Sequence, residues 1–171
     1  DEREEEQKLA RFLLSTDRAT TTDQLLKRLS DLQDTDGLWS WYPGMKGSLY
    51  TTEYVLRILL RLSATEGLEQ ALRLRLSSMI RRGIGALNAQ AVKDLAEVQK
   101  FKREKRVFTP HTGLDYLYLS ALAKEQKLQS LSAEAERAER YFLTQLRGEA
   151  HRLPLDSKPR AAVALLLAGD K

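Results

Sequence analysis

Apolar residues recur at helical spacing along most of the chain, and no stretch shows the strict alternation typical of a strand. One group of stretches is apolar on one face and charged on the other, which predicts amphipathic helices; these stretches lie near 23–33, 66–104 and 133–147. Each is followed by a stretch that is apolar nearly all round, which is typical of a buried helix. Those stretches lie near 53–62, 114–123 and 160–168. An earlier stretch, 2–14, also has helical spacing, so the sequence predicts an all-α protein.

The alternation of the two helix types is a weak internal repeat of a helical hairpin. Such units bury their apolar faces by stacking on their neighbours. With the apolar helices inside and the amphipathic helices outside, the pattern predicts an α/α toroid, or an arc of one. We therefore expect residues 1–171 to form a single helical domain that is a fragment of a larger toroid domain. An open solenoid fits the same pattern.

Hydroxyl residues before these stretches predict helix N-caps, because their side chains accept a hydrogen bond from a free backbone N–H. The predicted caps are Thr22, Thr51 or Thr52, Thr65, Thr112, Ser132 and Ser157. The stretch 66–104 reads as a short helix followed by a longer one from Ser77 to about Arg103. Gly83 and Gly85 are expected to weaken that longer helix locally, by about 1 kcal/mol each relative to alanine.

The most informative stretch, 29–62, joins two predicted helices through a tight turn and an aromatic cluster. Asp36 and Gly37 form a turn dipeptide, because glycine adopts a positive φ without steric cost. Both tryptophans of the chain, Trp39 and Trp41, follow this turn, with Tyr42 beside them. We interpret the cluster as a structural staple between the helices, with a surface for recognition as the alternative, because exposed Trp and Tyr often mark binding sites.

Composition and charge exclude several classes of function. The net charge is 28 − 24 = +4, which is not the profile of a dedicated nucleic-acid binder. The basic run at 100–106 reads as a solvated helix end, where cations favour the helix dipole. The chain has no cysteine and two histidines, too few for a metal site of their own. The longest apolar run is too short to cross a bilayer, so we expect membrane contact only through an anchor outside this chain.

Catalytic patterns are not found, and we expect no enzyme activity, no cofactor and no metal. The sequence has no glycine-rich phosphate loop and no G-x-S-x-G elbow. Asp34 and Asp36 flank a turn, and their simpler role is turn chemistry. His111 has an acidic residue four positions on, Asp115, but no third partner, so a loop or capping histidine is the preferred interpretation.

The segment LQDTDGLWSWYPGMKGSLYTTEYVLRILLRL resembles a hairpin of the thioester domain in bacterial α2-macroglobulin-like proteins, those of Bacteroidetes type above all. In that family an "LQ…DG-aromatic-x-W-aromatic" turn precedes a helix of the "T-x-Y-V-L-x-x-L" kind. The later segments FTPHTGLDYLYLSALAKEQKL and RAAVALLLAGDK resemble two further helices of the same domain. The resemblance covers about residues 25–171.

The resemblance implies a non-catalytic part of a protease trap in the cell envelope. The family's thioester domain is an α/α toroid, and a Cys-x-Glu-Gln motif carries the reactive bond in members that have it. This motif is absent here, and in the family it lies upstream of the hairpin. The expected partners are proteases and the other domains of the parent chain, in the periplasm or at the envelope as part of a lipoprotein. No catalytic, cofactor or metal residue is carried over from the family.

Two other classes of function stay open. Terpene cyclases and prenyltransferases use similar Q…W repeats on the same toroid, but they need an acidic motif or zinc ligands. The DTDG sequence is a poor match to such a motif. The third class is a stand-alone helical scaffold that binds proteins, for which exposure of Trp39, Trp41 and Tyr42 would be the mark.

Overall fold

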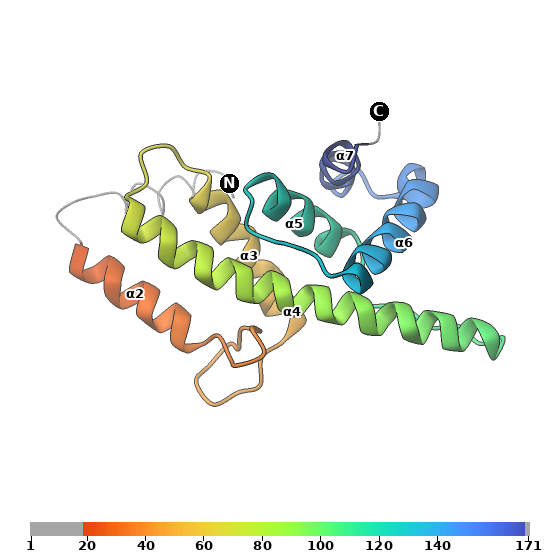
Figure 1. The fold of residues 1–171 in the computed structure, drawn as a ribbon, viewed down its shortest axis with the longest axis horizontal. Helices are drawn as coiled ribbons and strands as arrows, with labels where there is room; N and C mark the ends of the chain where they lie inside the picture. The colour runs from red at the N-terminus through yellow and green to blue at the C-terminus, as the bar shows by residue number, and fades with distance from the viewer. Residues whose placement is uncertain (1–18, 170–171) are drawn as a thin grey trace. The chain divides into compact units, whose positions relative to one another are not determined.

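The computed structural model describes residues 19–169, and every regular element in that part of the chain is a helix (Figure 1). The elements are α2 (Ala19–Asp31), α3 (Leu49–Ser63), α4 (Gln70–Arg103), α5 (Leu114–Glu125), α6 (Ala133–Glu149), the 3-10 helix η2 (Ala150–Arg152) and α7 (Lys158–Leu167). The prediction of an all-α protein is confirmed. The helix expected at 2–14 lies outside the described residues. The chain divides into two compact units, one up to Gly83 and one from Ile84 onward.

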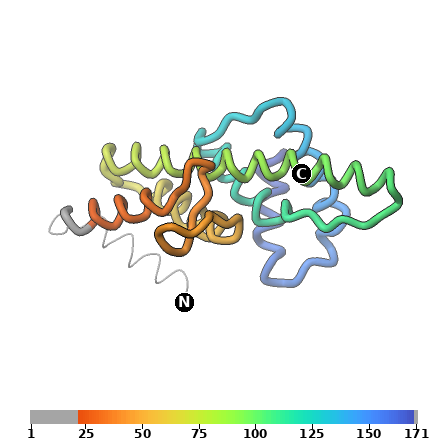
Figure 2. Tube along the Cα trace, turned by 90° about the horizontal axis from the view of Figure 1, so that it is seen from below, coloured from red at the N-terminus to blue at the C-terminus, as the bar shows by residue number. Residues whose placement is uncertain are grey.

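The first unit contains α2, α3 and the first half of α4. Helix α2 runs alongside this part of α4, as Figures 1 and 2 both show, and an ion pair joins Asp23 to Arg75 across the two helices. The apolar core of the unit comes from all three helices and from the corner between α2 and α3. Its members include Leu26, Trp39, Leu56, Leu59, Leu60, Leu76 and Ile80.

The second unit contains the rest of α4 together with α5, α6 and α7, and α7 packs on α5. Buried polar contacts fix the chain between α4 and α5, because both the backbone N–H and the hydroxyl of Thr112 donate to Asp94 at 2.7 Å. An ion pair between Asp115 and Arg160 joins α5 to α7. The apolar core includes Leu87, Ala91, Tyr116, Leu119, Ala138 and Phe142.

The helix starts are only partly as predicted. Ser132 caps α6 as expected, because its hydroxyl accepts from the Ala135 N–H. Ser157 holds the N-cap position of α7, but its hydroxyl makes no capping bond to a backbone N–H and accepts instead from the Arg160 guanidinium at 3.4 Å. The prediction for α3 is wrong: Ser48 is the cap and accepts from Thr51 N–H. Glycine at the start of α5 replaces the predicted cap, since the polar groups of Thr112 bind Asp94 instead.

The N-cap predicted at Thr22 is also wrong, because α2 begins at Ala19 and Thr22 is a buried residue inside it. The stretch expected to form two helices is one continuous helix, α4, of 34 residues. It runs through Gly83 and Gly85 without a break, and Gly83 has a packing role described below. Tertiary packing here overrides the low helix propensity of glycine.

The three apolar helices differ in burial. Helix α5 buries half of its residues, and α3 buries four leucines while Tyr50 and Tyr54 on its first turns stay exposed. The expectation that the stretch at 160–168 is buried all round is wrong. Helix α7 buries only Ala161 and Ala164, while Leu166 remains 66 % exposed. Apolar composition alone therefore does not determine which face of a helix the fold covers.

Candidate functional site

The corner between α2 and α3 is built from the residues of the LQ…DG…W motif. The amide of Gln33 donates to the carbonyl oxygens of Gly37 and Met79, both at 3.0 Å, and thereby links the turn to α4. A carboxylate oxygen of Asp34 accepts from the Leu38 N–H at 2.9 Å. The turn interpretation of Asp34 is thus confirmed. Gly37 adopts a φ of 87°, which explains why glycine stands at that position.

Trp39 lies at the centre of this corner and is 0 % exposed. Its backbone N–H donates to the Thr52 hydroxyl at 2.8 Å, and its indole N–H donates to the carbonyl oxygen of Leu29 at 2.9 Å. Its ring packs against α4 where Gly83 leaves room. Both N–H groups of the buried tryptophan are therefore satisfied, each by a residue of a different flanking helix.

Of the three residues considered for recognition, Trp39 is buried, and its contacts fit the interpretation as a structural staple between the helices. Trp41 and Tyr42 are 56 % and 68 % exposed, so the staple interpretation is wrong for these two side chains. The motif residues that carry the family resemblance are thus occupied in holding the corner together. These residues stabilise the corner, and exposed side chains lie beside them in the chain.

Five large apolar side chains next to the corner are exposed by half or more. We call them the aromatic surface: Trp41, Tyr42, Met45, Tyr50 and Tyr54. The first three lie in the loop before α3, and the two tyrosines lie one turn apart on α3 itself. The loop is anchored at both ends, because the Ser40 hydroxyl donates to the Leu32 carbonyl and the Ser48 N–H donates to the Trp39 carbonyl. The three loop residues of the aromatic surface therefore stand on a hydrogen-bonded support, and the two tyrosines stand on helix α3.

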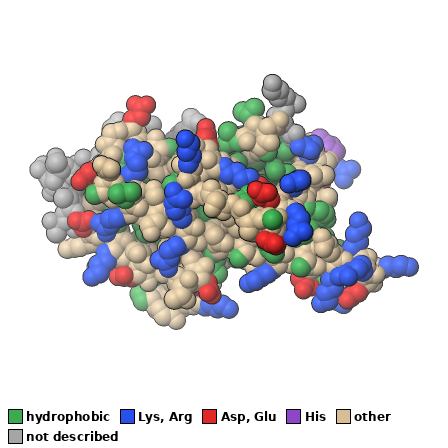
Figure 3. Space-filling view, in the orientation of Figure 1, with side chains coloured by type: hydrophobic (Ala, Val, Ile, Leu, Met, Phe, Trp, Pro, Cys, Tyr) green, Lys and Arg blue, Asp and Glu red, His purple; other side chains and the backbone are tan. Residues whose placement is uncertain are grey.

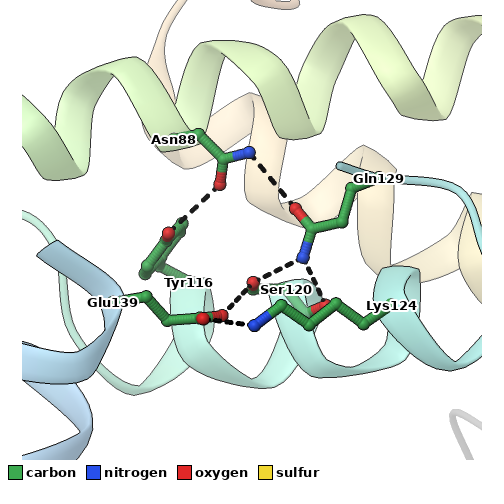
Figure 4. A network of polar contacts seen from close by, with 6 residues as sticks. All are labelled: Asn88, Tyr116, Ser120, Lys124, Gln129 and Glu139. Carbon is green, nitrogen blue, oxygen red and sulfur yellow. Dashed lines mark hydrogen bonds and ion pairs between the residues drawn. The ribbon is translucent and has the colours of Figure 1, made fainter. Parts of the chain in front are cut away.

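A cluster of polar side chains inside the second unit connects α4, α5, α6 and the segment between α5 and α6 (Figure 4). Its members are Asn88, Tyr116, Ser120, Lys124, Gln129 and Glu139. The Tyr116 hydroxyl donates to Asn88 at 3.1 Å, and Asn88 donates to Gln129 at 3.2 Å. Gln129 in turn donates to the Ser120 hydroxyl at 2.7 Å. Every member thus has a partner within the cluster, as buried polar groups require.

Glu139 is the charged centre of this cluster and is only 7 % exposed. It accepts from the Ser120 hydroxyl at 2.5 Å and forms an ion pair with Lys124. Burial raises the pKa of the Tyr116 phenol, and the nearby Glu139 carboxylate raises this pKa further. Ser120 is fully buried, so its hydroxyl is out of reach of a substrate. These contacts give the cluster a structural role, which is to join the helices of the second unit.

Sequence reasoning missed this cluster, since Glu139 reads as part of the charged outer face of 133–147. A usable signal was Ser120, which stands in the otherwise apolar stretch LDYLYLSALA. A serine inside a buried helix needs a hydrogen-bond partner from a neighbouring element.

Two hollows flank the second unit's helices. One has a volume of about 450 Å³ and a mostly apolar lining that includes Phe108, Pro110, Leu114 and Phe142. The other, of about 340 Å³, lies beside Lys124 and Glu139 of the polar cluster. Within residues 19–169 no group of three or more His, Asp or Glu side chains is arranged to hold a metal ion. No helix in the same range is long and apolar enough to cross a membrane.

Comparison of the chain with protein-family models, with curated proteins and with solved structures found no match.

Proposed function

We propose that this chain is a non-catalytic helical part of the thioester-like domain of a bacterial α2-macroglobulin-like endopeptidase inhibitor. Its part in that protein is to contact other proteins, either the captured protease or the neighbouring domains of the parent chain. The all-helical structure and the hydrogen-bonded LQ…DG…W corner support this proposal. The helical hairpins would then belong to an α/α toroid or an arc of one, in a protein of the periplasm or cell envelope.

The observation that carries the protein-binding role is the aromatic surface. Exposed Trp and Tyr side chains lose water at little entropic cost when a partner covers them, and they are enriched among the residues that dominate binding energy. Trp41 and Tyr42 stand next to a core residue, Trp39, on a loop anchored at both ends. A surface held in this way is organised before the partner arrives, which lowers the cost of binding.

Incubation of the full-length parent protein with a protease tests the trap. The expected result is cleavage within a bait region, followed by a loss of the protease's activity on large protein substrates while a small peptide substrate is still cleaved. Absence of bait cleavage together with unchanged activity on large substrates would contradict the proposal.

The aromatic surface is tested by Trp41→Ala and Tyr42→Ala in the full-length protein. Each change is expected to weaken complex formation by tenfold or more, since truncation of an interfacial aromatic residue often costs about 2 kcal/mol. Leu155→Ala is the matched control, because Leu155 is 83 % exposed and lies in the other unit. In Trp41→Ala, Trp39 is the remaining tryptophan, so its fluorescence emission reports whether the corner is still folded.

A stand-alone protein-binding scaffold would use the same aromatic surface, so it is the second candidate. The protease experiment distinguishes the two functions. A scaffold loses affinity for its protein partner in Trp41→Ala but leaves proteases free to digest large substrates. The macroglobulin-like function requires both effects.

A further inference from the structure

Seven residues at the end of α4 carry a net positive charge as large as that of the whole chain. The stretch 100–106, KFKREKR, holds five basic residues and one acidic residue, a net charge of +4. The complete chain has 28 basic and 24 acidic residues, so the other 164 residues carry 23 of each and sum to zero. The rest of the chain sums to zero without being uniform, since residues 70–82 hold four arginines and no acidic residue. Five cations within seven residues at a helix end create a local positive potential.

The structure gives this end a defined shape, which we call the basic tip: Lys100, Lys102, Arg103, Lys105, Arg106 and Val107. Helix α4 ends at Arg103, and the chain reverses through Lys105, whose φ is 56°. The Arg106 N–H donates to the Phe101 carbonyl at 2.9 Å, and the Lys105 N–H donates to the Lys102 carbonyl at 3.2 Å. This turn normally places glycine at the left-handed position. Lysine there adds a cation despite the less favourable backbone conformation.

Aromatic residues hold the tip together from within. The rings of Phe101 and Phe108 lie 5.3 Å apart, and the Arg106 guanidinium lies 4.7 Å from the centre of the Phe101 ring. Val107 follows Arg106 in the chain and is 92 % exposed. Figure 3 shows the Lys and Arg side chains gathered over this end of α4. Lys100 pairs with Glu97 at 3.6 Å and Arg106 with Glu104 at 3.3 Å. The tip therefore combines five clustered cations, two of them paired, with one exposed apolar side chain.

We propose that the basic tip docks on the surface of a bilayer that contains anionic lipids. The cations would lie at the level of the headgroup phosphates, and Val107 would enter the boundary with the acyl chains. A single-stranded nucleic acid would need free aromatic faces for its bases. Here the Phe101 ring is instead covered by Arg106 and packed against Phe108. This contact is separate from the aromatic surface and independent of the proposed protease trap.

Vesicle flotation with the 171-residue chain tests the proposal. At about 0.1 M salt the chain is expected to float with phosphatidylcholine vesicles that contain phosphatidylglycerol, and not with phosphatidylcholine alone. The double variant Lys102→Gln/Lys105→Gln is expected to bind roughly 30-fold more weakly, at about fivefold per cation near an anionic surface. Val107→Ser is expected to weaken binding by roughly fivefold.

The control is Lys27→Gln/Arg28→Gln, which removes the same charge from exposed positions on α2. Its binding is expected to stay within about twofold of the unchanged chain. An equal loss in both double variants would overturn the proposal, because binding would then follow net charge alone. Equally tight binding to a single-stranded oligonucleotide, unaffected by Val107→Ser, would assign the tip to nucleic acid instead. No flotation with either vesicle would also refute it.

Discussion

The ring of Trp39 fills the space that a side chain at Gly83 would need. A β-carbon built on Gly83 would lie 2.6 Å from the Cζ3 atom of Trp39 and 3.0 Å from a methyl group of Leu56. Trp39 is fully buried and held by hydrogen bonds at its backbone N–H and its indole N–H. Its ring therefore cannot easily move away from a side chain placed at position 83. The corner between α2 and α3 can lie close to α4 because glycine stands at this point of the helix.

Gly83→Ala is therefore expected to destabilise the protein, although alanine is the better helix former. Overpacking costs about 1–3 kcal/mol, which exceeds the roughly 0.5–1 kcal/mol gained in helix propensity. Gly85→Ala, two residues further along the same helix, is the matched control. Open space surrounds a β-carbon at Gly85, so this change is expected to stabilise by about 0.5–1 kcal/mol. Urea denaturation measures both, and effects of the same sign would contradict the packing argument.

The Thr52 hydroxyl is expected to be essential to the corner. It accepts from the Trp39 N–H and donates to the Ser48 carbonyl at 2.7 Å. Thr52→Val keeps the shape of the side chain but leaves a buried N–H without a partner, which costs about 1–3 kcal/mol. Thr144→Val provides the control, since Thr144 is exposed and its change is expected to stay within about 0.5 kcal/mol. Equal midpoints in thermal denaturation would show that the hydroxyl is dispensable.

The ion pair of Lys124 and Glu139 is asymmetric, because the two side chains are 44 % and 9 % exposed. Lys124→Met leaves a buried carboxylate and is expected to cost about 2–3 kcal/mol. Glu139→Gln keeps an acceptor for Ser120 and leaves a half-exposed ammonium group in water, at a cost of about 1 kcal/mol or less. Chemical denaturation at neutral pH compares the two, and a larger loss in Glu139→Gln would disprove the asymmetry.

The raised pKa of Tyr116 predicts a loss of stability in alkaline solution. Above its ordinary pKa of 10, the unfolded chain releases the phenol proton while the folded chain retains it. The unfolded state then binds fewer protons, so the free energy of unfolding falls as pH rises, by up to about 1.4 kcal/mol per pH unit. Below pH 10 this effect is absent.

Tyr116→Phe tests this, because phenylalanine cannot ionise. The variant is expected to be about 1–2 kcal/mol less stable at pH 8, where it lacks the hydrogen bond to Asn88. That gap should narrow between pH 10 and pH 11 as the unchanged protein loses stability. Tyr54→Phe, at an exposed position, controls for general alkaline effects. A gap that stays constant with pH would contradict the prediction.

The helices could be predicted from spacing because each needs one apolar face, and that face is visible in the sequence around residues such as Leu56, Ala138 and Phe142. The turn role of Asp34 could be predicted for the same reason, since its partner Leu38 is four residues away. Interactions of this kind join residues close together in the sequence, so they can be predicted from it.

Contacts between distant residues could not be predicted. Glu139 reads as an outward-facing charge, and only the fold places it against Ser120 and Lys124. Gly83 reads as a weak point of α4, and only the position of Trp39 reveals why glycine is needed there. The division of the aromatic cluster into a buried Trp39 and an exposed Trp41 also depends on which side of the loop faces the core.

The corner also has a consequence for the order of folding. Most of its hydrogen bonds join residues within the span 29–52, so little chain entropy is lost in closing it. Short-range contacts of this kind form quickly, so we expect the corner to form before α4 docks on it. Changes at Thr52 should then slow folding, whereas changes at Gly83 should mainly speed unfolding. The motif that marks the sequence would thus also mark where the chain begins to fold.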